Sequence, residues 1–176
     1  NSVIPSSGDV TIQVWAYAEE WEYTDNGYGN VVAQGDPSYS TDNNTGAYFI
    51  SYEDDNQMRV SHTWSNIQVS YPFDKWVNIA VVKNNEGTKL YLNAQLVDST
   101  TSTELPAATG KFCIGTQYTE IIEYWNGYID ELSVWSIALD STDIQNNMSN
   151  QLSGNEGGLV AYYNFNAGEG STLYDH

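Results

Sequence analysis

The side chains best suited to chemistry are two adjacent acids, Asp130 and Glu131, in the aromatic-rich stretch 125–135. Hydrolysis of a glycosidic bond needs one carboxyl group to donate a proton and a second to attack or to stabilise charge, with both facing one cleft. The stretch has the pattern of a β-strand, and neighbouring side chains on a strand point to opposite faces of the sheet. We therefore expect no catalytic pair here and no enzymatic activity.

Nucleophilic and zinc chemistry lack their residues as well. The two histidines, His62 and His176, are far apart, and neither lies in the sequence context of a serine or cysteine nucleophile. The one cysteine, Cys113, cannot form an intramolecular disulfide, and with two distant histidines it does not make a zinc site. Its place between Phe112 and Ile114 predicts a buried core thiol.

The charge balance excludes several partners. The 176 residues include five basic and 23 acidic side chains, which gives a net charge of -18. Nucleic acids and anionic bilayers both require clustered lysine and arginine, so we expect neither as a partner. No apolar run is long enough to span a membrane. The acids can be solvated surface charge, calcium ligands or an adaptation to a high-salt habitat, and composition leaves the three open.

Aromatic residues in polar stretches suit sugar recognition. Their rings stack on the apolar side of a pyranose while neighbouring polar groups bind its hydroxyls. The candidates lie in two long predicted loops, 19–30 and 35–46, and just before a predicted strand: Trp21, Tyr23, Tyr28, Tyr39, Tyr124 and Trp125. Packing at the rim of the fold is the alternative for each. By contrast, Trp15, Trp76 and Trp135 occupy strand positions and are predicted to lie in the core.

The elements that must position these residues are almost all strands. Apolar and polar residues alternate, with many β-branched and aromatic side chains, in ten segments: 11–17, 31–34, 47–52, 58–64, 76–83, 89–92, 95–98, 112–114, 128–135 and 159–165. One helix is predicted from Ser141 to about Asn150, with Asp140 as N-cap and Asp143 completing a capping box. This pattern predicts an all-β fold, an antiparallel two-sheet β-sandwich with one short helix.

Several segments in this order resemble one family. They are 10–15, the tryptophan-led strand 75–82, the hairpin 89–93, the Gly-Tyr-Ile-Asp-Glu segment 127–131 and the closing strand 158–165. The set is similar to laminin-G-like domains of the concanavalin A-like lectin and glucanase superfamily, with pentraxins as more distant relatives. The resemblance implies a concanavalin A-like jelly roll. We expect residues 1–176 to form a single such domain, excised from a longer multidomain protein.

The resemblance also implies a metal. Acids in the Ile-Asp-Glu strand of this family often hold a structural ion, which makes Asp130 a candidate calcium ligand; the alternative is a buried acid bonded to backbone amides. Similarity to pentraxins would place a second calcium site at Asp42 and Asn43, where ordinary turn capping is the alternative. The Glu-x-Asp-x-x-Glu motif of the superfamily's glucanases is missing.

One departure from the family concerns a hairpin. The family usually has Asn-Gly where this chain has Asn93 and Ala94. Tight hairpin turns need positive φ, which alanine adopts only with strain, so we expect a turn of another type.

These observations together predict a non-catalytic, calcium-stabilised carbohydrate-binding module of a secreted or cell-surface protein, with a glycan or polysaccharide as partner. An adhesion or spacer domain that contacts protein is the alternative, and a glycan-active enzyme is the least favoured interpretation.

Overall fold

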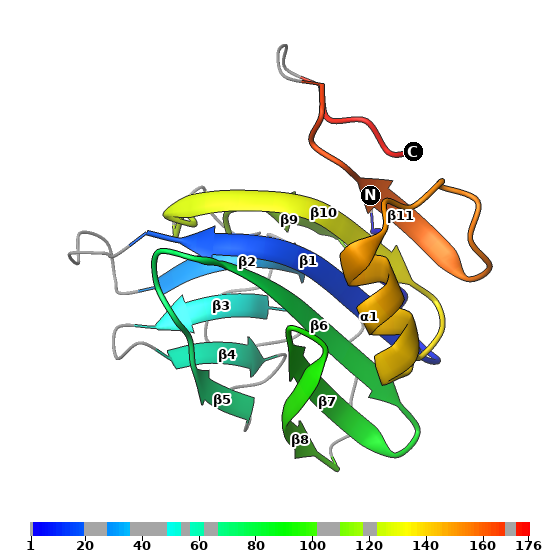
Figure 1. Cartoon of the computed structure of the whole chain (residues 1–176), viewed down its shortest axis with the longest axis horizontal. Helices are drawn as coiled ribbons and strands as arrows, with labels where there is room; N and C mark the ends of the chain where they lie inside the picture. Colours follow the sequence, from blue (N-terminus) through cyan, green and yellow to red (C-terminus); the bar gives the residue numbers. More distant parts are fainter. Residues whose placement is uncertain are drawn as a thin grey trace.

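A computed structural model describes residues 2–19, 28–35, 49–53, 57–61, 67–101, 110–117, 123–167 and 172–176, with only the backbone at 28, 49, 52, 53 and 61. The chain forms two antiparallel sheets and one helix (Figure 1). The first sheet has six strands in the order β11 (Leu159–Tyr163), β10 (Gly127–Trp135), β1 (Val10–Ala18), β6 (Trp76–Asn84), β7 (Gly87–Leu92) and β8 (Gln95–Thr100). The second has five, in the order β5 (Ile67–Ser70), β4 (Gln57–Ser61), β3 (Phe49–Glu53), β2 (Tyr28–Gly35) and β9 (Lys111–Ile114).

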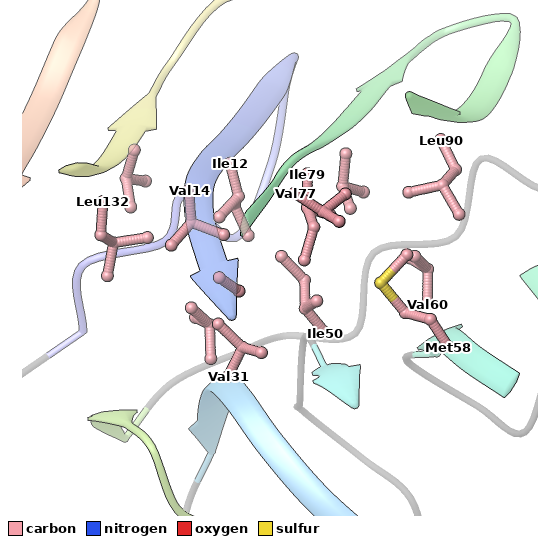
Figure 2. Close-up of a cluster of buried hydrophobic side chains, with 14 of the residues drawn as sticks. Ile12, Val14, Val31, Ile50, Met58, Val60, Val77, Ile79, Leu90 and Leu132 are labelled. Atoms are coloured by element: carbon pink, nitrogen blue, oxygen red, sulfur yellow. The ribbon is translucent and has the colours of Figure 1, made fainter. Parts of the chain in front are cut away.

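The core lies between the two sheets, as the alternation of apolar residues predicts. Along β1 every second side chain, from Val10 to Ala18, faces the second sheet and is almost completely buried. Both sheets contribute to the cluster in Figure 2, which labels Ile12, Val14, Val77, Ile79, Leu90 and Leu132 from the first sheet and Val31, Ile50, Met58 and Val60 from the second. The predicted β-sandwich jelly roll is confirmed.

Some details differ from the sequence-based expectation. The strand β5 was not predicted. The strand predicted over 58–64 corresponds to β4 as far as Ser61, and positions 62–64 lie outside the described residues. Cys113 is only half-buried, because its neighbours Phe112 and Ile114 take the inward positions of β9 and pack against the core. The thiol therefore lies on the other side of the second sheet. Within the described residues no helix is long and apolar enough to cross a membrane.

The helix α1 (Ser141–Ser149) forms as predicted and covers part of the outer face of the first sheet. The Asp140 carboxylate accepts hydrogen bonds from the backbone N–H groups of Thr142 and Asp143, and Asp143 completes the capping box. The helix and the turn before it pack on the sheet through a second apolar cluster, made of Ala80, Val82, Tyr91, Ala94, Trp135, Leu139 and Ile144. From the sheet, the Gln13 side-chain amide donates to the Ile144 carbonyl oxygen at 3.0 Å.

The hairpin between β7 and β8 keeps the positive-φ geometry that the family's glycine would supply. Asn93 has φ 49° and Ala94 has φ 61°, so the expected change of turn type does not occur. The Ala94 side chain is 7% exposed and belongs to the cluster under α1. Burial of its methyl group offsets part of the strain, which gives a physical reason for alanine at this position.

Candidate functional site

Three aromatic side chains lie in one row across the outer face of the first sheet. Tyr17 on β1 is paired with Trp76 on β6 and with Tyr128 on β10, and directly opposite residues share a face of the sheet. The ring centroid of Tyr17 lies 5.8 Å from that of Trp76 and 5.7 Å from that of Tyr128. Trp76 and Tyr128 are 6.4 Å apart. We call these three residues the aromatic row.

The aromatic row faces solvent. Trp76 is 44% exposed and Tyr128 is 58% exposed, large fractions for aromatic side chains on a sheet. The row lies at the end of β1 that is farther from α1 in Figure 1, so the helix leaves it uncovered. The prediction that Trp76 is a core residue is therefore wrong. Its neighbour Val77 is 1% exposed and takes the inward position, which turns Trp76 outward.

A second row lies between the aromatic row and the helix. It consists of Asn78, Trp15 and Asp130, which are paired across β6, β1 and β10. Trp15 is half-buried on this outer face and so is not part of the core between the sheets, contrary to the prediction. Trp135, the third tryptophan predicted to be buried, is 3% exposed and lies under α1. One sheet face thus changes from covered to open along the length of β1.

The two adjacent acids make different hydrogen bonds. The Asp130 Oδ1 atom accepts the backbone N–H of Glu131 at 2.9 Å. A β-bulge interrupts the register beside them, and Glu131 has φ 50°. The Glu131 carboxylate accepts a short hydrogen bond from the Tyr162 hydroxyl on β11. Burial, followed by that hydrogen bond and the charge of Glu131, raises the pKa of Tyr162. Glu131 is thus engaged by a neighbouring strand, an arrangement that suits a structural role.

The surroundings of the aromatic row are acidic. Burial raises the pKa of Tyr17, and the charges of Asp74 and Glu19 raise it further. Both acids are tied to this end of the sheet through their backbones. The Asp74 N–H donates to the Ala18 carbonyl oxygen at 2.8 Å, and the Glu19 N–H donates to that of Asn126 at 3.0 Å. Rings and carboxylates therefore occur together at this end of the first sheet.

The aromatic residues predicted to bind ligand are not those of the aromatic row. Trp21, Tyr23 and Tyr39 lie outside the described residues, and Tyr28 is described only as backbone, paired with Glu53 between β2 and β3. Tyr124 is 53% exposed and forms a bridge with Asn30 on β2.

Trp125, the neighbour of Tyr124, is partly buried. Its ring packs against the core and meets Tyr71 edge to face at 6.2 Å. Packing is therefore the better account of Trp125. Beside it, Asn30 donates its side-chain amide to the Glu123 carboxylate at 2.9 Å. Burial raises the pKa of Glu123, and this hydrogen bond partly opposes the rise.

The described residues do not form a cluster of calcium ligands. Within it, no three acidic, histidine or cysteine side chains gather to hold a metal ion. Asp130 is paired with Trp15 across the strands, so its nearest cross-strand neighbour on that side is an aromatic ring rather than an oxygen ligand. Asp42 and Asn43 lie outside the described residues. Calcium stays a prediction.

Comparison with solved structures shows relatives of the same fold. A Bacteroides ovatus protein proposed to bind carbohydrate superposes with a TM-score of 0.74 at 16% identity, over 96% of this chain and 49% of that one. A carbohydrate-binding module of a Ruminococcus gnavus sialidase, bound to α2,3-sialyllactose, gives 0.59 at 12% identity, over 79% and 82%. A Trypanosoma rangeli sialidase with 2,3-difluorosialic acid gives 0.60 at 15% identity, over 85% and 24%.

The chain thus spans about half the length of the Bacteroides ovatus protein and about a quarter of the trypanosomal sialidase. No curated protein matches the sequence. A laminin-G family model, described as the concanavalin A-like lectin/glucanases superfamily, matches residues 1–145. The chain therefore belongs to the concanavalin A-like lectin/glucanase superfamily.

Proposed function

We propose that this domain is a non-catalytic carbohydrate-binding module that contacts its ligand through the aromatic row. The observation that carries the proposal is the solvent exposure of Trp76 and Tyr128 on a rigid sheet, on either side of Tyr17. Aromatic rings held in this way can stack on the C–H faces of sugar rings without losing much conformational freedom on binding. Asp130 in the adjacent row supplies a carboxylate that can accept hydrogen bonds from sugar hydroxyls.

The relatives support the same class of function. The Bacteroides ovatus protein is proposed to bind carbohydrate, and the Ruminococcus gnavus module was solved with a sialylated sugar. Catalysis has less support, because the usual mechanism of glycoside hydrolysis places two carboxyl groups on either side of one bond. Here Asp130 is paired with Trp15 on the outer face, whereas Glu131 is hydrogen-bonded to Tyr162 on β11, so the two adjacent acids are directed to different neighbours. We infer that the domain binds sugar without cleaving it.

The test is loss of glycan affinity on replacing a ring of the aromatic row. An aromatic side chain can bury about 150–250 Å² of surface. Trp76 is 44% exposed, so roughly 65–110 Å² of its surface is open to ligand. At ~25 cal/mol per Å², complete coverage contributes about 1.6–2.8 kcal/mol, and coverage of one ring face about half of that. Trp76→Ala should therefore weaken glycan binding about four- to ten-fold in titration calorimetry, with Tm nearly unchanged.

Two matched variants separate the alternatives. Tyr174→Ala removes a ring that is 60% exposed in the C-terminal segment, where His176 is bonded to β11, and it should leave binding unchanged. Tyr124→Ala removes a ring from the rim position that the sequence predicts. If Tyr124→Ala abolishes binding and Trp76→Ala does not, the ligand lies at the rim and the aromatic row is excluded.

Calcium and export complete the proposal. We propose a calcium ion as a stabilising ligand on the chemistry of the acidic chain, with Asp130 as its described candidate. Three results together would support this: chelator lowers the Tm, added calcium restores it, and Asp130→Asn no longer responds to either. A Tm that chelator leaves unchanged excludes it. We also propose that the parent protein acts outside the cell or at its surface, where a polysaccharide ligand is accessible.

A further inference from the structure

We propose that the aromatic row binds the end or a short stretch of a single neutral glycan chain, and that it rejects both sialylated glycans and crystalline polysaccharide. This inference rests on the proposed carbohydrate-binding function and specifies the class of ligand. Two independent observations carry it: the tilt of the rings and the charges around them.

The rings do not share a plane. Tyr17 meets Trp76 at an interplanar angle of 65° and Tyr128 at 71°, while Trp76 and Tyr128 are tilted by 42°. A crystalline polysaccharide presents a flat layer of sugar rings, so binding to it requires aromatic faces in one plane. The tilted pair instead leaves two faces, 6.4 Å apart at their centres, that contact sugar rings of a single flexible chain from different directions. The geometry favours a soluble oligosaccharide.

The charges around the rings disfavour an anionic ligand. Asp74 and Glu19 act on Tyr17 from the loops at this end of the sheet, where their backbones are hydrogen-bonded to Ala18 and Asn126. Lys75, just before Trp76, is the basic residue nearest to the row in sequence, against these two acids and a net charge of -18. A carboxylate or sulfate placed on the rings would be repelled, most strongly at low ionic strength. The related Ruminococcus gnavus module was solved with a sialylated sugar, so this chain is expected to differ from it in specificity.

A glycan array with matched pairs tests the inference on the whole 176-residue domain. Each neutral oligosaccharide, such as lactose, is compared with its sialylated counterpart, such as α2,3-sialyllactose, at low and at high salt. We expect neutral members to bind at least ten-fold more tightly than their sialylated partners at low salt. The ratio should shrink in high salt and in the double variant Glu19→Gln, Asp74→Asn, because both changes weaken the repulsion. A pull-down with microcrystalline cellulose should recover no protein.

The outcomes are distinguishable from one another. Neutral hits that weaken in Trp76→Ala and in Tyr128→Ala support the inference. Equal or tighter binding of the sialylated partners overturns the charge argument, and capture by crystalline cellulose overturns the ring argument, while both leave the proposed function standing. Neutral hits that survive both substitutions remove the aromatic row as the site. If no glycan binds at all, the proposed function itself is wrong and the inference falls with it.

Discussion

Replacing Gly127 by alanine should destabilise the domain and disturb the aromatic row, because the backbone of β10 approaches that of β1 too closely for a side chain there. Gly127 has φ 148°, a conformation that other residues rarely adopt. A Cβ atom added to it would overlap the Tyr17 carbonyl oxygen and lie 2.9 Å from the carbonyl carbon and 3.2 Å from Ala18 Cα. All three are backbone atoms of the paired strand, so none of them can rotate away.

The size of the effect follows from three contributions. Forced positive φ costs about 1–3 kcal/mol, and overpacking against fixed atoms costs about another 1–3 kcal/mol. The lower entropy of the unfolded alanine chain offsets about 0.4–1 kcal/mol. The net loss for Gly127→Ala is therefore about 1–5.6 kcal/mol. For a domain of this length it corresponds to a fall in Tm of roughly 2–22 °C.

Two other glycines separate these contributions. Gly8 has φ 81° and no atom within 4 Å of an added Cβ, so Gly8→Ala lacks the overlap and reports the cost of positive φ minus the unfolded-chain offset, about 1 kcal/mol. Gly157 has neither a strained φ nor a nearby atom, so Gly157→Ala should be neutral or slightly stabilising.

Urea unfolding of the three variants measures the order directly, and titration with a glycan shows whether Gly127→Ala also weakens binding. If Gly127→Ala costs no more than Gly8→Ala, the close approach of β10 to β1 beside Tyr17 is incorrect, and the positions of the rings in the row are incorrect with it.

Two further predictions concern the helix and the core. Asp140→Ala removes the acceptor for two N–H groups and a favourable charge at the N-terminus of α1. It should lower the free energy of unfolding in urea by about 1–2 kcal/mol, whereas Asp140→Asn, which keeps the acceptor, should lose only a small part of that. Burial raises the pKa of Tyr71, whose hydroxyl donates to the Ala16 carbonyl oxygen at 3.0 Å. Because the pKa is higher in the folded than in the unfolded protein, it contributes stability that is fully present below the unfolded-state pKa of about 10 and is lost as pH rises further. Tyr71→Phe should therefore flatten this alkaline decline in Tm. At pH 7 it should lower the free energy of unfolding by about 1–2 kcal/mol. An unchanged alkaline slope in Tyr71→Phe would show that the hydroxyl is not buried as described.

The predictable part of the fold is the part that local patterns determine. Alternation along β1 identifies its inward residues, and the acids at 140 and 143 identify the start of α1, because each signal lies within a few neighbouring residues. Trp76 shows where local reading fails. A tryptophan at the start of a strand suggests a core residue. Along β6, however, Trp76 points to the same face as Asn78 and away from the face of Val77, which places it on the outer face.

The aromatic row could not be predicted from the sequence. Its three rings come from strands far apart in the chain, and only the register of β1 with β6 and β10 makes them neighbours. A shift of one residue in either pairing would send a ring to the opposite face. The β-bulge at Glu131 makes the pairing of β10 with β1 harder still to predict. It shifts the register between the helix-covered end of β10 and the end that has Asp130 and Tyr128. Sequence reasoning could identify aromatic residues suited to sugars but had no means of bringing these three together.

Under the proposed function, the same outer face has both a structural and a binding role, and α1 divides the two. Under the helix the face is apolar and closed, with Ile144 0% exposed and Gln13 bonded to the Ile144 carbonyl oxygen. Beyond it, Trp15 and Asp130 lead to the aromatic row, whose outer rings are open to solvent. Since the covered end fixes β1, β6 and β10 relative to one another, the open end can present aromatic rings without rearranging. Such pre-organisation reduces the entropy lost on binding, which is why we propose that a small group of rings is sufficient for a measurable affinity for sugar.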